Sequence, residues 1–275
     1  MSQVIEFVKC NPTQNMTILV KTSHATEEYI HIASKIMSYD NVYGEQVGFI
    51  EKSYNNGVDA SLKMAGGEFC GNACMALAAF VAAERGVQHL DITEVVLEAS
   101  GTEQFVRCQV KRNGDEYDCE LGMPLPKQIE RKTIQYEGSD LEMVIVRYED
   151  FIHIVLKVDD FDEAVKRKAQ TLAKLLGVTL GSKLIGILLY KRKSAEMAPL
   201  IYVPHLDSMV WERGCGSGTA SLGACLAWEN KREFSMPIKQ PGGIINVAAY
   251  FNGEKLTDLK IAGTVGIVAQ GQAFI

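Results

Sequence analysis

The sequence predicts an α+β protein of two similar halves, each made of mixed strands wrapped on one buried helix. Short runs rich in β-branched and aromatic residues, separated by turn residues, recur along the 275-residue chain. Two segments of small and apolar residues, 73–83 and 219–228, predict helices that are apolar on every side and therefore buried. Each predicted helix follows a cysteine, Cys70 or Cys215, and these two cysteines lie 145 positions apart, one in each half.

Composition and charge narrow the class of protein. The 47% hydrophobic and 23% charged content is typical of a soluble globular protein, and the net charge of −6 predicts no basic surface for nucleic acid or an anionic membrane. The apolar runs are shorter than the ~20 residues of a membrane helix, and the N-terminus lacks a signal-peptide pattern. We therefore expect a cytoplasmic protein, and the seven cysteines, an odd number, argue against a complete disulfide framework.

The first half is expected to hold seven strands and two helices. The strand composition places the strands at 3–9, 16–21, 45–50, 61–64, 92–98, 103–111 and 116–121. The first helix is expected at 26–38, because its apolar side chains recur at helical spacing and Thr26 supplies a cap. Between the first two strands, residues 10–15 have loop composition, and Asn15 either points at a site or closes a turn.

The second half repeats this order of elements. Strands are expected at 142–147, 152–158, 184–190, 199–203, 208–211, 244–251, 256–262 and 265–269. The outer helix is expected at 162–176, with Asp162 as its cap and Gly177 at its end. The buried helix at 219–228 follows Cys215, as its counterpart follows Cys70.

A proline-containing segment at 124–126 is the expected domain linker. It divides the chain into an N-terminal domain, 1–125, which carries Cys70, and a C-terminal domain, 126–275, which carries Cys215. The last strand of the chain can pack back on the N-terminal domain.

The cysteine at the start of each buried helix is the main candidate for chemistry. The first N–H groups of a helix have no internal partner, and together with the helix dipole they favour an anion. A thiol placed there loses its proton more easily than a thiol in solution. The small neighbours Gly71 and Asn72, or Gly216 and Ser217, allow a carboxylate to reach the backbone N–H groups. Each motif therefore predicts a reactive thiol beside a cradle for a small anion.

Two such thiols suit the inversion of a stereocentre without a cofactor. One thiolate removes a proton from a carbon and the opposite thiol returns a proton to the other face, so one group must be charged and one neutral. A dominant thiolate at pH 7 needs a pKa about two units below the usual ~8.5, which corresponds to roughly 2.7 kcal/mol. A helix N-terminus supplies at best ~2 kcal/mol. We expect the pair to settle as one thiolate and one thiol, helped by a substrate ammonium group.

Three other kinds of site compete with this interpretation. A cysteine–histidine hydrolase needs a histidine beside one thiol, and none of the five histidines lies in a recognisable hydrolase motif. A metal site at Cys70 and Cys74 lacks a Cys-x-x-Cys or histidine partner motif, and a redox pair normally has shorter spacing than Cys70 and Cys215. We expect no metal and no cofactor, and we assign no chemistry to the remaining cysteines, which have core-like surroundings in the sequence.

Six stretches, spread over nearly the whole chain, match the pattern of one protein family. They are QVIEF-K-NP--NMTILV at 3–20, EQVGFIE at 45–51, EFCGNA-M at 68–75, PLIY-P at 199–204, WE--CGSGTAS at 211–221 and QPGG at 240–243. On these stretches the chain resembles the cofactor-independent, two-cysteine amino-acid racemases with the diaminopimelate epimerase fold, and most of all the branch that racemises histidine for opine metallophore biosynthesis. The resemblance implies two pseudo-symmetric domains, a site in the cleft between them and a homodimer.

The resemblance also implies roles for ten residues. The two acid/base thiols would be Cys70 and Cys215. The backbone cradle of the substrate α-carboxylate would be formed by Gly71, Asn72, Gly216 and Ser217. The partners of the α-amino group would be Asn15, Gln46 and Glu212, and the imidazole would meet Glu45.

Departures from the diaminopimelate epimerase pattern bear on the substrate. Where those enzymes have Gly-Asn-Pro-His and Asn-Val-Glu-Phe, this chain has Asp150–His153 and Ile185–Leu188. The asparagines that hold the far end of diaminopimelate are therefore absent, and Phe151 and Trp211 are candidate walls of an apolar or aromatic pocket. These features favour a single-headed amino acid such as histidine. A diaminopimelate epimerase, and an amino-acid-binding protein on the same fold without turnover, are the alternative hypotheses.

Overall fold

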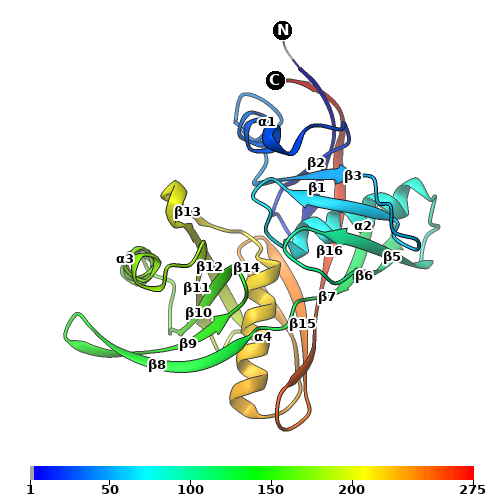
Figure 1. Cartoon of the computed structure of the whole chain (residues 1–275). Helices are drawn as coiled ribbons and strands as arrows, with labels where there is room; N and C mark the ends of the chain where they lie inside the picture. The colour runs from blue at the N-terminus through cyan, green and yellow to red at the C-terminus, as the bar shows by residue number, and fades with distance from the viewer. Residues whose placement is uncertain (1–2) are drawn as a thin grey trace. The chain divides into compact units, whose positions relative to one another are not determined.

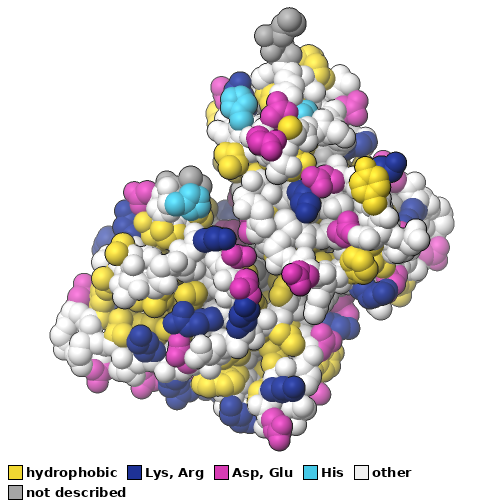
Figure 2. Space-filling view, viewed as in Figure 1, with side chains coloured by type: hydrophobic (Ala, Val, Ile, Leu, Met, Phe, Trp, Pro, Cys, Tyr) yellow, Lys and Arg dark blue, Asp and Glu magenta, His cyan; other side chains and the backbone are white. Residues whose placement is uncertain are grey.

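The computed structural model describes residues 3–275, which divide into two compact units (Figure 1). Unit 1 comprises the described residues up to Met123 together with Ile261–Ile275. Unit 2 comprises Pro124–Lys260. On the face drawn in Figure 2, acidic and basic side chains are interspersed. Within residues 3–275, no helix combines the length and the hydropathy needed to cross a membrane.

Unit 1 is a ring of strands around one helix. Its strands are β1 (Val4–Pro12), β2 (Thr17–Val20), β3 (Gln46–Glu51), β4 (Ala60–Met64), β5 (Ile92–Ala99), β6 (Val106–Asn113), β7 (Glu116–Gly122) and the later part of β16 (Leu256–Phe274). The strands from β1 to β7 are hydrogen-bonded in chain order, and β16 pairs with both β7 and β1, which closes the ring. Helix α2 (Gly71–Glu84) contacts all seven of the first strands and is buried along most of its length, because its side chains are small or apolar on every side (Figure 1).

Helix α1 (Tyr29–Ile36) packs on the outside of this ring, against β1, β2 and β3. The side chains that it buries are those of Tyr29, Ile32, Ala33 and Ile36, which recur at the predicted helical spacing. The prediction that Thr26 caps this helix is wrong. Residues Thr26–Glu28 form a 3-10 turn whose N-cap is Ala25, and the Glu28 carboxylate accepts a hydrogen bond from the Ala25 N–H at 3.3 Å. The side chains that α1 buries begin only at Tyr29. The preceding turn therefore has no buried side chains that would stabilise it as α-helix.

Unit 2 is a twisted mixed sheet with a helix on each face. Its strands are β8 (Gln128–Tyr136), β9 (Ser139–Arg147), β10 (Phe151–Lys157), β11 (Leu184–Lys191), β12 (Glu196–Val203), β13 (Ser208–Trp211), β14 (Phe234–Gln240) and β15 (Gly243–Phe251), with a 3-10 turn at Pro204–Leu206. Their order is β15-β14-β12-β11-β10-β9-β8, and β13 adds to β12. Helix α3 (Glu163–Leu180) contacts β11 and β12, and helix α4 (Gly216–Asn230) contacts β9, β10, β11, β14 and β15.

Alternation along β10 shows that α3 and α4 cover opposite faces of the sheet. Ile152, Ile154 and Leu156 belong to the core cluster that includes the buried side chains of α3. The intervening His153 instead forms a hydrogen bond with Ser221 of α4. Successive side chains of a strand point to opposite faces, so a strand covered on both sides is buried throughout, as the pattern along β10 is from Ile152 to Leu156.

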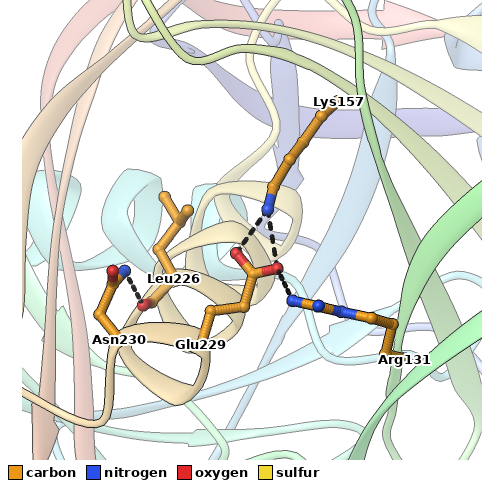
Figure 3. A network of polar contacts seen from close by, with 5 residues as sticks. All are labelled: Arg131, Lys157, Leu226, Glu229 and Asn230. Atoms are coloured by element: carbon orange, nitrogen blue, oxygen red, sulfur yellow. Dashed lines mark hydrogen bonds and ion pairs between the residues drawn. The ribbon is translucent and has the colours of Figure 1, made fainter.

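The C-terminal end of α4 is held to the sheet by an ionic cluster (Figure 3). The Glu229 carboxylate accepts hydrogen bonds from Lys157 of β10 at 2.7 Å and from Arg131 of β8 at 2.8 Å (Figure 3). Only 10% of the Glu229 side chain is exposed, whereas both cations reach solvent. One turn earlier in the same helix, the Leu226 carbonyl accepts a hydrogen bond from the Asn230 side-chain amide at 2.6 Å.

Two strands and several element boundaries differ from the sequence prediction. Strands β8 and β14 were not expected. The sequence of β8 is largely polar and exposed, and β14 contains Pro237, a residue that is unusual inside a strand. The predicted strands 256–262 and 265–269 are one continuous strand, β16, and β1 continues to Pro12 before the turn at Thr13 and Gln14, whose φ angles are positive.

Helix α3 is also longer than predicted. Asp162 is its N-cap, as expected, and accepts a hydrogen bond from the Val165 N–H at 2.8 Å. Gly177 does not end the helix: it is buried at a close contact, where an added Cβ would lie 3.0 Å from the Tyr202 ring. Gly181, in the left-handed conformation with φ 61°, is the residue at which α3 ends.

Candidate active site

Cys70 occupies the N-cap position of α2 in unit 1. Its backbone is extended, with φ −129° and ψ 107°, and its sulfur accepts a hydrogen bond from the Ala73 N–H at 3.4 Å. The structure describes all seven cysteines, all of them free, and Cys70 alone is not buried. A thiol at this position meets the positive end of the helix dipole and remains open to reagents.

The Cys70 sulfur belongs to a short chain of hydrogen bonds inside unit 1. The thiol donates to the Gln46 side-chain carbonyl, Oε1, at 2.8 Å. The amide nitrogen of Gln46, Nε2, in turn donates to Asn15 Oδ1. Asn15 is 1% exposed, and its own backbone N–H donates to the Pro12 carbonyl at 3.0 Å, so it both closes the turn and joins the cysteine. The prediction that Asn15 closes a turn is confirmed.

The loop that leads into Cys70 is fixed from behind by the turn at Ser100 and Gly101. The Ser100 hydroxyl donates to the Glu68 carbonyl at 2.8 Å and accepts from the Met64 N–H at 3.0 Å. At Gly101, where φ is 73°, an added Cβ would lie 2.2 Å from the Phe69 nitrogen. Only glycine fits this close backbone approach. Burial raises the pKa of the Glu68 carboxyl above its usual value.

The remaining candidates of unit 1 are divided between buried and exposed positions. Gly71 and Asn72 form the buried first turn of α2. A Cβ at Gly71 would lie 3.0 Å from both Ile261 and Met123, so the glycine lets the helix start sit directly against these side chains. Glu45 is exposed, and its backbone N–H donates to the Met16 carbonyl at 2.7 Å.

Cys215 occupies the matching N-cap position of α4 in unit 2. Its φ and ψ are −117° and 106°, and its sulfur accepts a hydrogen bond from the Gly218 N–H at 3.3 Å. The Ser217 hydroxyl lies 3.6 Å from the sulfur. The backbone of Cys215 is held by a ring of contacts that the sequence did not predict: its N–H donates to Gln240 Oε1 at 2.8 Å, Gln240 donates to the Thr219 hydroxyl at 2.8 Å, and Thr219 donates to the Cys215 carbonyl at 2.6 Å.

The Cys215 sulfur has a negatively charged side chain beside it. Burial, followed by the negative charge of Glu212 and a hydrogen bond to its carboxylate, raises the pKa of the Cys215 thiol well above its usual value. The Ser217 hydroxyl and the Gly218 N–H act in the opposite direction. The Cys70 thiol donates to the neutral amide of Gln46. Because its pKa is raised, Cys215 is a protonated thiol when no ligand is bound.

A buried histidine supports the first turns of α4, and sequence reasoning noted His153 only as a departure from a motif. Its Nδ1 lies 2.7 Å from the Ser221 hydroxyl, which donates to Tyr148 at 3.0 Å. Burial lowers the pKa of His153 to about 3, although a hydrogen bond to the Ser217 backbone opposes this shift. A Cβ at Gly186 would lie 2.3 Å from the His153 ring. Alternation along β10 was the available signal, because it places His153 opposite the apolar side chains.

Phe151 and Trp211, the predicted pocket walls, are both engaged inside unit 2. The Phe151 ring stacks on Tyr148 with centroids 4.3 Å apart. Trp211 packs against the core cluster that α3 covers. Within the units, the structure thus brings together two groups: Asn15, Gln46 and Cys70 in one, and Glu212, Cys215 and Ser217 in the other.

Comparison with solved structures places this fold among those of racemases and epimerases. A probable proline racemase from Agrobacterium radiobacter K84 aligns with a TM-score of 0.72 and 11% identity over 97% of this chain and 92% of that chain. A predicted epimerase from Pseudomonas aeruginosa aligns with a TM-score of 0.69 and 13% identity over 97% and 98%. The fold is thus a mixed fold of helices and strands, mostly strands, that is similar to the folds of these racemases and epimerases.

Sequence comparison identifies the family. The family model described as histidine racemase CntK N-terminal domain matches residues 4–274, and the chain belongs to this family. A histidine racemase from Staphylococcus aureus is 32% identical over 99% of this chain and 98% of that protein. A histidine racemase from Fusobacterium nucleatum is 28% identical, again over 99% and 98%.

Proposed function

We propose that this protein racemises histidine, interconverting the L and D forms without a cofactor. The observation that carries the proposal is the family match over residues 4–274, together with histidine racemases that align along almost their whole length. The activity is that of an isomerase of the racemase and epimerase type.

We assign the two proton transfers to Cys70 and Cys215. One sulfur, as thiolate, removes the α-proton, and the other, as thiol, delivers a proton to the opposite face of the same carbon. The observation in support is that each unit places its cysteine at the N-cap of a buried helix, with nearly the same backbone angles and an N–H from three residues later on the sulfur. In the reverse direction the two sulfurs exchange roles.

The carboxylate of the amino acid would bind at the two helix starts. The backbone N–H groups of Gly71 and Asn72, and those of Gly216 and Ser217, lie in the first turns of their helices and are the donors that this role requires. They would also stabilise the negative charge that develops when the α-proton leaves, since an enolate-like carboxylate carries that charge on its oxygens.

Substrate binding next to Glu212 would activate the Cys215 thiol. Burial, and after it the Glu212 carboxylate, raises the pKa of the thiol and keeps it protonated when no ligand is bound. A substrate ammonium group beside Glu212 would neutralise that charge, so the pKa of Cys215 would fall when the amino acid binds. Asn15 and Gln46 would contribute polar contacts to the same amino group, and Glu45, which is exposed, would meet the imidazole.

Further parts of the proposal concern organisation and context. We propose that the two units correspond to two pseudo-symmetric domains, divided near residues 125 and 126, and that the protein is a homodimer. The free state of all seven cysteines supports a reducing, cytoplasmic location. The D-histidine produced would supply an opine metallophore pathway.

The test is a racemisation assay on a panel of amino acids that includes diaminopimelate. Chiral chromatography should show D-histidine accumulating from L-histidine until the two are equal, with a higher kcat/KM than for any other member of the panel. A higher kcat/KM for diaminopimelate would favour an epimerase of that substrate instead. Histidine binding in calorimetry without turnover would favour a binding protein, and neither binding nor turnover would remove the proposal.

A further inference from the structure

The contact between Cys70 and Gln46 fits only one of the two charge states that a racemase cysteine must adopt. In the structure the thiol donates its proton to Gln46 Oε1 at 2.8 Å. Once the proton leaves, a thiolate and a carbonyl oxygen face each other at that distance, and both are acceptors. A cysteine that acts as acid in one direction and base in the other occupies both states in every catalytic cycle, so the contact must be able to change.

Rotation of the Gln46 side-chain amide would change this contact. A primary amide has an acceptor at one end and a donor at the other, of nearly equal size, and its terminal torsion has a broad, roughly two-fold energy profile. Rotating the Gln46 amide by half a turn would place Nε2 on the thiolate. It would also turn Oε1 toward Asn15, where Nε2 now donates to Asn15 Oδ1.

Asn15 completes the arrangement because it is an amide as well. After Gln46 turns, two oxygens would face each other unless the Asn15 amide turns too and offers Nδ2 to Oε1. The side chains come from three elements of one unit, with Asn15 before β2, Gln46 at the start of β3 and Cys70 at the start of α2. Residue Thr17 of β2 pairs with Gln46 of β3, which holds the two amides next to each other.

We propose that the side-chain amides of Gln46 and Asn15 turn together when Cys70 gains or loses its proton, so that the same two residues stabilise both the thiol and the thiolate. The proposal deepens the proposed function and rests on it, since only a two-base racemase needs both states of Cys70. It makes Gln46 a catalytic residue that contacts the reacting sulfur, and Asn15 a positioning residue that acts through Gln46.

Other titratable groups lie next to these residues and need controls. Glu45 precedes Gln46 in the chain, and Glu68 lies two residues before Cys70. The Cys74 thiol lies one helical turn after Cys70, whose charge raises the pKa of Cys74. Burial raises the pKa of the Glu68 carboxyl and of the Cys74 thiol. The variants Glu45→Gln and Glu68→Gln therefore measure how much of any shift at Cys70 is simple charge interaction.

The experiment follows the ionisation of Cys70 by its alkylation with iodoacetamide between pH 5.5 and 10, in the full chain carrying Cys215→Ser. The five other remaining cysteines are buried, so the Cys70 peptide, quantified by mass spectrometry, reports the reaction. Gln46→Glu keeps an acceptor but removes the donor, and should move the midpoint up by about one to two pH units, a ~10- to 100-fold slower alkylation at pH 7. Gln46→Met removes both and should move it by less than one unit.

The paired substitutions at Asn15 test the coupling between the amides. Asn15→Asp offers only acceptors, so it keeps Nε2 of Gln46 away from the sulfur and should raise the midpoint by about one pH unit. Asn15→Leu leaves the Gln46 amide free to turn and should change the midpoint by less than about 0.3 units. The effect of Asn15→Asp should also exceed the opposite shift caused by Glu45→Gln.

Two results would overturn the proposal. One is a midpoint for Gln46→Glu within about 0.3 units of the parent protein, and the other is an equal midpoint for Asn15→Asp and Asn15→Leu, with circular dichroism showing that the variants are folded. The alkylation needs no substrate and no turnover. A protein that fails to racemise histidine can therefore still pass or fail this test, and the two failures are distinguishable.

Discussion

Replacing Gly101 by alanine tests whether the loop before Cys70 is held as tightly as the structure indicates. The new Cβ would lie 2.2 Å from the Phe69 nitrogen and 2.7 Å from the Glu68 carbonyl carbon, which are backbone atoms that cannot turn aside. Gly86 offers a matched control in the same unit. Its φ of 68° is close to the 73° of Gly101, but nothing lies within 4 Å of an added Cβ.

The difference between the two variants isolates the clash. Alanine in the left-handed region costs roughly 1–2 kcal/mol at either position. Overlap with fixed neighbours adds about 1–3 kcal/mol at Gly101 alone. For a protein of this size a loss of 1 kcal/mol lowers Tm by about 2–4 °C, so Gly101→Ala should melt about 2–12 °C below Gly86→Ala.

Thermal unfolding followed by circular dichroism measures this difference, and both glycines report on the unfolding of unit 1. Histidine racemisation should fall in Gly101→Ala, because a shifted Phe69 moves Cys70, and should stay within twofold of the parent in Gly86→Ala. Equal Tm values for the two variants would refute the reasoning, since the tight backbone approach at Gly101 would then be absent in solution.

Three more predictions follow from the site and its supports. Cys70→Ser and Cys215→Ser should each abolish racemisation in the chiral assay, because a hydroxyl is a far weaker base than a thiolate; turnover by either variant would contradict its assigned role. His153 is neutral in the folded protein, with a pKa of about 3 against about 6.5 when unfolded, so the free energy of unfolding in urea should fall as pH drops below 6.5, by about 2 kcal/mol at pH 5. His153→Phe should remove that part of the pH dependence, and an unchanged slope would argue against a buried neutral histidine. Glu229→Gln should lower the free energy of unfolding by about 1–3 kcal/mol, because the Glu229 side chain is 10% exposed and accepts hydrogen bonds from two cations. The control Glu130→Gln, at a more exposed ion pair, should lower it by less than about 1 kcal/mol. Equal losses for the two variants would show that the cluster at Glu229 adds no stability.

The local pattern of small and apolar residues was sufficient to predict the two helices that follow Cys70 and Cys215. A run of small apolar residues after Cys70 and another after Cys215 predicted two buried helices, and the structure has them as α2 and α4. Strand β8 was missed because its sequence is largely polar, and β14 was missed because Pro237 interrupts its strand-like composition. The end of α3 was misplaced because the contact of Gly177 with Tyr202, a tertiary contact, overrides the usual role of glycine as a helix stop.

The surroundings of the candidate thiols were less accessible to sequence reasoning. The hydrogen bond between Gln46 and Cys70 joins residues 24 positions apart, and the one between His153 and Ser221 joins residues 68 positions apart. Neither follows from periodicity, because both depend on which strand lies beside which helix. The ring through Gln240 was hidden for the same reason, since the QPGG stretch matched the family pattern but gave no contact partner for Gln240.

The most direct test of the two-sulfur mechanism is the fate of hydrogen at the α-carbon during the first turnovers of L-histidine in deuterated water. The account predicts that the earliest D-histidine is fully α-deuterated while the remaining L-histidine keeps its α-protium, because one sulfur removes the proton and the other delivers a solvent-derived deuteron. α-Protium in the earliest D-histidine would mean that a single group returns the hydrogen it removed, and would contradict the account.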